Sequence, residues 1–223
     1  MTRYFHEELE QIKEKVLKLG SITEAMVENA VASLVDQDSR LAEETIAADQ
    51  RADHLEVEID EACIRLLALF QPAAGDLRFV TTAMKVSTDL ERMADQAVNI
   101  SQRAIELNEE PQLKPYIDIP IMSQLAQKML RECLDAFVRR DAELAREVIE
   151  ADNKVDALKN QVFRELLTFM MEDPRTIARA IRLLLVSRHL ERVADHATNI
   201  AEMVVFLVEG KNIRHVTPQE QGH

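Results

Sequence analysis

Oxygen-bearing side chains recur in this chain at a spacing suited to cation binding. They are Glu91, Asp95 and Asn99, repeated 100 positions later as Glu191, Asp195 and Asn199. Residues four apart lie on one stripe of an α-helix, so each set presents its oxygens to one side. Carboxylates at this spacing repel each other, and a cation between them would remove the repulsion. The pattern therefore predicts one cation site in each half of the chain.

A second pair of carboxylates, also four residues apart, occurs twice. Its copies are Asp49 with Asp53 and, 103 positions later, Asp152 with Asp156. Asp53 and Glu91 each stand 19 residues from Pro72, so antiparallel helices joined near that proline would hold the two pairs level. Four carboxylates and an amide oxygen per half form a hard-oxygen ligand set, suited to Mg, Mn, Ca or iron.

The simpler interpretation is that these acids decorate a solvated helix face. Duplication of both pairs at fixed register favours a metal site over that interpretation. Histidine does not strengthen the case, because His196 is replaced by Gln96 and His54 by Ala157 in the matching positions. We therefore expect both histidines to be exposed or to pack between helices. There is no HExxH motif, and no ExxH motif of the kind found in di-iron bundles lies within the six predicted helices.

The elements that must position these residues are long helices. The segment 90–100 matches 190–200 closely, and a 100-residue period is too long for a solenoid, so we interpret the chain as two copies of one domain. Apolar residues recur every three or four positions and no segment alternates with period two. The prediction is an all-α protein of six long helices in two tandem three-helix bundles. The predicted parts are a bundle over 1–109, a Pro-rich linker over 110–120, a second bundle over 121–210 and a tail over 211–223.

The boundaries of the individual helices follow from breaks in the apolar periodicity. The first half is expected to contain helices over 5–36, 39–70 and from Asp76 to Asn108, with Asp38 and Asp76 as N-caps. Gly20 is expected to lie within the first helix without ending it. In the second half the first helix is expected over 121–138, the break before the last helix at Pro174, and its end near Gly210.

Composition excludes several classes of function. A formal charge of −13 argues against nucleic-acid binding and favours divalent cations or basic partner surfaces. Cys63 and Cys133 are too few for a disulfide scaffold and are expected in the core. The first residues do not resemble a signal peptide and the longest apolar run, 203–208, is too short to span a membrane, so we expect a soluble, cytoplasmic protein. No GxSxG motif or Gly-rich phosphate loop is present.

The motif LERxADxAxNI, present in both halves with a Pro-containing turn about 20 residues before it, resembles the PhoU family of bacterial phosphate-uptake regulators. The resemblance covers residues 5 to 210. It implies two similar three-helix bundles, no enzymatic activity, and a multinuclear metal centre of iron, or alternatively Zn, Mn, Mg or Ni. Its metal motifs map onto Asp49/Asp53 with Glu91/Asp95 and onto Asp152/Asp156 with Glu191/Asp195, with Asn99 and Asn199 as additional candidates.

The same resemblance implies a homodimer that links the ATPase of a phosphate ABC transporter to a sensor histidine kinase and reaches the membrane only through them. Such an adaptor represses the phosphate-starvation response when phosphate is plentiful. Two alternatives remain. One is a helical-bundle metalloenzyme, a metal-dependent hydrolase or oxidase, and the other is a helical scaffold whose acids bind nothing.

Overall fold

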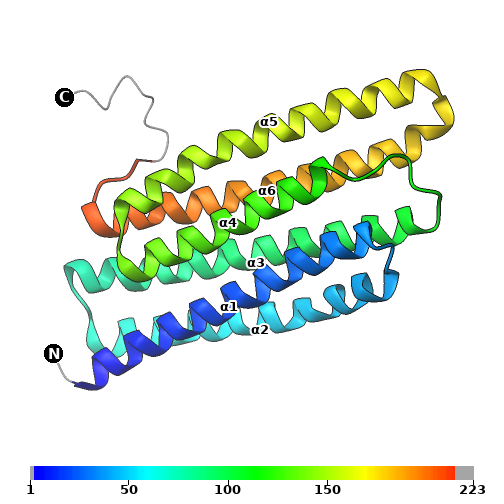
Figure 1. The fold of residues 1–223 in the computed structure, drawn as a ribbon. Helices are drawn as coiled ribbons and strands as arrows, with labels where there is room; N and C mark the ends of the chain where they lie inside the picture. The colour runs from blue at the N-terminus through cyan, green and yellow to red at the C-terminus, as the bar shows by residue number, and fades with distance from the viewer. Residues whose placement is uncertain (1–2, 214–223) are drawn as a thin grey trace, which may run out of the picture.

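A computed structural model describes residues 3–213 and contains only helices over that range (Figure 1). The long helices are α1 (Arg3–Val35), α2 (Ser39–Phe70), α3 (Ala74–Asn108), α4 (Asp118–Arg139), α5 (Ala142–Glu172) and α6 (Ile177–Glu209), and a short 3₁₀ helix, η1 (Pro174–Thr176), joins the last two. The all-α prediction is confirmed. None of the described helices is long and apolar enough to cross a membrane.

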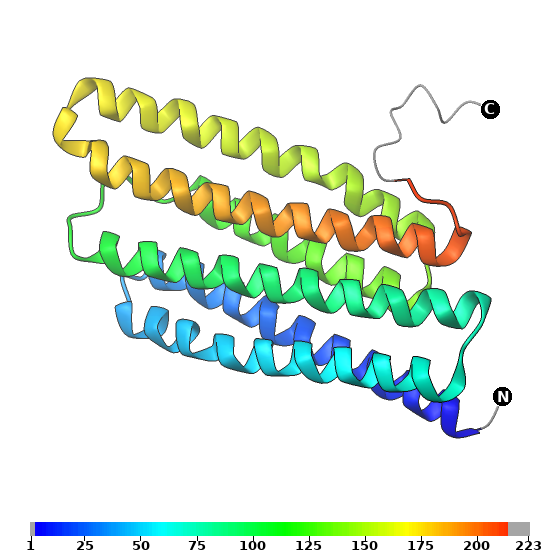
Figure 2. The ribbon, with the colours of Figure 1, turned by 180° about the vertical axis from the view of Figure 1, so that it is seen from behind.

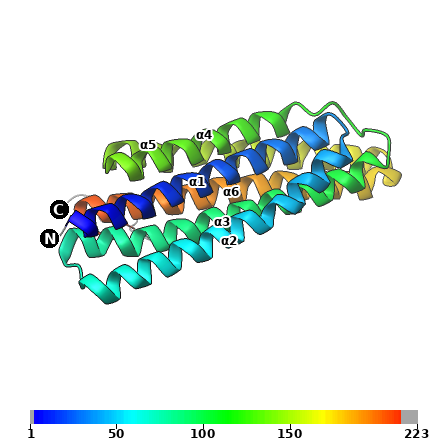
Figure 3. The same cartoon turned by 90° about the horizontal axis from the view of Figure 1, so that it is seen from below.

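The first three helices form one bundle and the last three another. Helices α3 and α6 lie side by side along the middle of the molecule, while α2 and α5 lie at opposite outer edges (Figures 1 and 2). Seen from below, α1 also runs along α4, so the halves meet through two helix pairs (Figure 3). Buried apolar side chains from all six helices form one continuous core. The outer helices α2 and α5 carry the second acidic pairs, and the central helices α3 and α6 carry the LER motifs.

Side-chain caps mark the starts of α2 and α5, and a glycine marks the end of α6. As predicted, Asp38 caps α2, its Oδ1 accepting a hydrogen bond from the Leu41 N–H at 3.0 Å. Gly210, at φ 71°, ends α6 in the left-handed conformation that glycine adopts without strain. The prediction that Asp76 caps α3 is wrong. The helix begins two residues earlier at Ala74, which leaves Asp76 in the first turn. Its negative charge still interacts favourably there with the positive end of the helix dipole.

The linker is shorter than predicted. Helix α4 begins at Asp118 rather than 121, so Pro120 lies in its first turn. A proline is tolerated there because the first N–H groups of a helix have no intrahelical acceptor to lose. The linker is anchored by Lys114, whose buried ammonium contacts Glu165 of α5 and lies 3.6 Å from Asp118. Of the predicted tail, residues 214–223 lie outside the described range.

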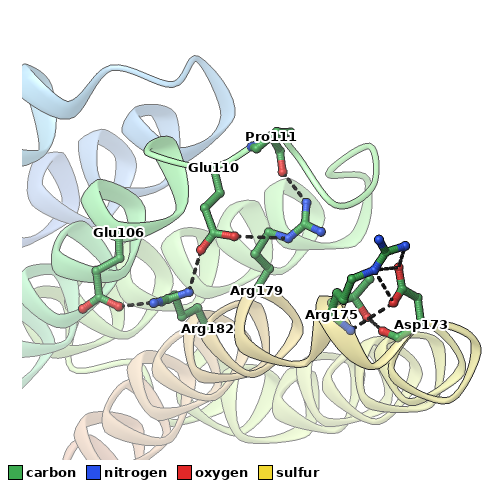
Figure 4. Close-up of polar contacts among 8 residues, drawn as sticks. Glu106, Glu110, Pro111, Asp173, Arg175, Arg179 and Arg182 are labelled. Atoms are coloured by element: carbon green, nitrogen blue, oxygen red, sulfur yellow. Dashed lines mark hydrogen bonds and ion pairs between the residues drawn. The ribbon is translucent and has the colours of Figure 1, made fainter.

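Ion pairs fasten the halves together at the linker end (Figure 4). Arg182 of α6 donates from Nε to Glu106 at 2.8 Å and from Nη1 to Glu110 at 3.1 Å, while Arg179 donates to the Pro111 carbonyl at 2.7 Å. Further along, Gly20 is buried inside α1, which runs through it as predicted, and the absent side chain leaves room for Leu134 of α4. These contacts hold the two bundles in one fixed register.

Candidate metal centre

The structure brings the two acidic pairs of the first half together across α2 and α3. The charges of Asp53 and Asp95 both act on Asp49, and those of Asp95, Asp53 and Asp49 all act on Glu91. Equal distances from the turn at Pro72 therefore do place the pairs level, as the sequence predicted. We call Asp49, Asp53, Glu91 and Asp95, together with the neighbouring Glu56, the first-half cluster.

The second half repeats the arrangement on α5 and α6. The charges of Asp195, Asp156 and Glu191 all act on Asp152, so these four carboxylates also lie close together. Here an ammonium lies among them. Lys159 Nζ is 2.9 Å from Asp156 Oδ1 and 2.7 Å from Glu191 Oε1. We call the four acids and Lys159 the second-half cluster.

Glu56 and Lys159 are the residues that sequence reasoning missed. They occupy the same place in the duplication, since Lys159 follows Glu56 by the 103 positions that separate the Asp pairs. Aligning the copies three residues beyond Asp53 would have revealed them. The first-half cluster therefore contains five acids, and the second-half cluster contains four acids with a cation of its own. The two sites have the same plan but different electrostatics.

Burial and mutual repulsion make these carboxylates hard to ionise. Burial, with the charges of Asp53 and Asp95, raises the pKa of Asp49 to about 6. Burial, with the charges of Asp195, Asp156 and Glu191, also raises the pKa of Asp152 to about 6, although Lys159 opposes the shift. The pKa values of Glu91, Asp95 and Asp195 are raised as well, with partial loss of solvent the largest cause. Such shifts are typical of carboxylates that a bound cation would stabilise.

The donor chemistry fits a hard cation. As placed, no three His, Cys, Asp or Glu side chains within residues 3–213 are arranged to hold a metal ion. Asp49 Oδ1, however, is buried without any hydrogen-bond partner, and an orphaned carboxylate oxygen facing other carboxylates is a group that a metal ion would satisfy. Asp53 and Asp95 are exposed, so their side chains can reorient toward an ion without repacking the core.

The asparagines behave differently from the acids. Asn99 donates from Nδ2 to the Asp95 carbonyl of its own helix at 2.8 Å. Asn199 reaches across to α3, its Nδ2 lying 3.5 Å from Asp89 Oδ1. Each four-residue step rotates the stripe by roughly 40°, which carries the third position away from the cluster. That the two asparagines are metal ligands stays a prediction. The position of Asn199, which reaches toward Asp89 and away from the cluster, does not favour it.

Other polar residues in and next to the LER motifs lie at the interface between α3 and α6, which we call the seam. His196 Nδ1 lies 2.8 Å from Asp89 Oδ1, and His189 Nδ1 lies 2.8 Å from Gln96 Oε1. The two contacts are related by the duplication, since each joins position 89 of one copy to position 96 of the other. His196 thus packs between helices, as expected, and His54 is exposed beside Glu58.

The raised pKa values predict a pH effect on the metal-free protein. Unfolded Asp has a pKa near 3.9, so stability from Asp49 and Asp152 is fully present below about pH 4 and is lost as pH rises through about 6. Asp49→Asn with Asp152→Asn is expected to raise stability at pH 7 by roughly 1 kcal/mol, the effect being reduced by solvent screening, and to change it little at pH 4. Urea unfolding with EDTA at both pH values measures the difference, and an equal effect at both would contradict the account.

Known proteins share this architecture. The PhoU domain matches residues 16–104 and 119–204, once in each half. A PhoU homolog from Aquifex aeolicus, described as a phosphate-specific transport system accessory protein, is 46% identical over 96% of this chain and 97% of its own length. The crystal structure of PhoU from Pseudomonas aeruginosa superimposes with a TM-score of 0.90 at 43% identity, covering 93% of this chain and all of the other. A phosphate transport system regulatory protein PhoU from Streptococcus pneumoniae gives a TM-score of 0.87 at 31% identity, over 94% and 99% of the two chains.

Proposed function

The chain belongs to the PhoU family, and we propose that it is a metal-binding regulatory adaptor of phosphate uptake. In this role it represses the phosphate-starvation response when phosphate is plentiful, and it acts by binding rather than by turnover. The observation that carries the proposal is full-length similarity to accessory proteins of the phosphate-specific transport system, 46% identical over 96% of this chain in one case. The duplicated carboxylate clusters, on the same plan in both halves, support the metal component.

The ligands of the proposed metal centres are the four duplicated acids of each half, with Glu56 added in the first-half cluster. The orphaned Asp49 oxygen and the hard-oxygen donor set support this proposal. We expect a multinuclear centre of iron, with Zn, Mn, Mg or Ni as alternatives. A bound cation would neutralise the mutually repelling carboxylates and tie each outer helix to its central helix.

The proposed partners are the ATPase of a phosphate ABC transporter and a sensor histidine kinase, with the protein a cytoplasmic homodimer held at the membrane through them. Similarity to transport-system accessory proteins supports the first partner, and family resemblance is the ground for the kinase. The net charge of −13 gives the chain an acidic surface that suits basic patches on such partners. Contacts of that kind associate fast and weaken with salt.

Binding and turnover measurements separate the adaptor from a metalloenzyme. We expect the purified chain to bind the transporter ATPase or the kinase's cytoplasmic region, and its affinity to fall as salt rises from 50 to 300 mM. Metal-loaded protein is expected to show no steady hydrolysis of phosphate esters. Turnover that disappears in Asp95→Ala with Asp195→Ala would identify an enzyme. Absence of binding to both partners would leave the adaptor without support.

A further inference from the structure

The second half exposes apolar side chains on its outer helix and on the start of α6. Phe163, Leu167 and Met171 of α5 are 49%, 43% and 78% exposed, and Ile177 and Ile181 of α6 are 40% and 45% exposed. The four-residue spacing places each set on one stripe of its helix. We call these five residues the α5–α6 apolar face. Contiguous apolar surface on the order of a few hundred Å² commonly marks an interaction site.

A groove extends this face between the two helices. It has a volume of about 290 Å³ and is lined by Phe163 and Asn160 of α5 and by Leu184 and Arg188 of α6. Phe163 belongs to both the face and the groove, and Leu184 continues the α6 stripe three residues after Ile181. Lys159 and Glu191 of the second-half cluster also line the groove. The apolar face therefore leads from the α5–η1–α6 turn, at one end of the molecule in Figure 1, toward the acidic cluster.

The duplication shows that the bundle itself does not need these side chains. The positions in α2 and α3 that match Phe163, Met171, Ile181 and Arg188 are occupied by smaller or polar residues, Asp60, Ala68, Thr81 and Thr88. Both halves nonetheless form three-helix bundles with buried cores. Three of the five face positions are apolar in both copies: Ile64 with Leu167, Ala68 with Met171 and Leu77 with Ile177. Phe163 and Ile181 are thus the face residues that are apolar in the second half alone.

Charge around the face indicates what kind of partner fits it. Three acids near it are already paired: Glu191 with Lys159, Glu165 with Lys114 and Asp173 with Arg175. Within the described residues, neither Arg164 nor Arg188 makes a side-chain ion pair, and both are exposed. Charge therefore favours a different protein, one that supplies carboxylates.

We propose that the α5–α6 apolar face docks an amphipathic helix of a partner protein. Apolar side chains of that helix, spaced three or four residues apart, pack on the face and into the groove, and a carboxylate beside them meets Arg188. This inference rests on the proposed function, because the helix belongs to the regulatory partner. It adds the surface on which that partner binds and the chemistry that the partner must present.

Paired variants of the full-length protein test the proposal against both purified partners. Leu167→Glu with Ile181→Glu is expected to weaken binding of the transporter ATPase or the kinase region by at least about tenfold, as removal of central interface anchors does. The matched control, Ile64→Glu with Leu77→Glu, places the same charges on exposed apolar positions of the first half and is expected to change affinity less than about twofold. Arg188→Glu is expected to weaken binding by about threefold to tenfold. Circular dichroism confirms that each variant is folded.

Each other outcome overturns the proposal. If wild type binds a partner and the face variant binds equally well, or if the control loses as much affinity, the docking face is wrong while the proposed function stands. If wild type binds neither partner, both fail. Loss of a dimer in the face variant, by sedimentation velocity, would assign the face to a second copy. Loss of binding to phosphatidylglycerol vesicles, with partner affinity intact, would assign it to the membrane.

Discussion

The double substitution Asp95→Ala with Asp195→Ala is expected to leave the protein folded and nearly free of metal. Each change removes one carboxylate from one cluster, and both residues are exposed, so no core packing is lost. Removing a like charge four residues from Glu91 or Glu191 relieves repulsion worth a few tenths of a kcal/mol, so the stability of the metal-free form is expected to stay constant or rise slightly. With metal in excess, each single variant is expected to keep about half the metal of wild type, because the clusters lie on separate helix pairs.

The two clusters are not expected to bind metal equally well. A cation entering the second-half cluster must displace the ammonium of Lys159 from Asp156 and Glu191, whereas the first-half cluster has Glu56 at that position. At limiting metal, Asp195→Ala should therefore retain more metal than Asp95→Ala. Lys159→Glu should strengthen the second-half cluster, and the matched exchange Glu56→Lys should weaken the first.

Elemental analysis by inductively coupled plasma spectrometry measures these differences after EDTA stripping and reloading with iron(II) or manganese(II) alone. Wild type and the double variant are compared at equal protein concentration, with circular dichroism as the folding control. Equal metal content in the two proteins would show that the clusters are not the metal centres. Equal behaviour of Lys159→Glu and wild type at limiting metal would show that the ammonium does not compete.

Much of the fold could be predicted because its determinants are local. Three- and four-residue apolar spacing specifies each long helix, and Asp38 and Gly210 mark helix ends by hydrogen bonding and backbone conformation. The start of α4 could not be predicted, because Pro120 forbids a helix interior but is compatible with a first turn. Asp76 likewise suits either a cap or a first-turn position, and the chain uses the second.

The acidic clusters could be predicted because their geometry depends only on helix rise and on equal distances from a turn. The seam between the halves could not. Which face of α3 meets α6 is decided by packing between distant segments, and it includes polar side chains such as Asp89 and His196 that no apolar pattern marks. The rotation of Asn199 toward that seam and the reach of Lys159 to Glu191 depend on side-chain directions that spacing alone does not specify.

Deleting the gene in its host is expected to leave phosphate-starvation genes expressed when phosphate is abundant. An adaptor that represses the response by occupying its partners cannot do so when it is absent, so the loss should be nearly complete rather than graded. Reintroduced wild type is expected to restore repression. Leu167→Glu with Ile181→Glu is expected to restore it poorly, whereas the matched Ile64→Glu with Leu77→Glu is expected to restore it fully.

The most direct test of the regulatory function is the activity of a phosphate-starvation promoter reporter, measured at high and low phosphate in wild-type and deletion strains. We predict strong expression at both phosphate levels in the deletion strain, and repression at high phosphate in wild type and in the complemented strain. Normal repression at high phosphate in the deletion strain would contradict the account.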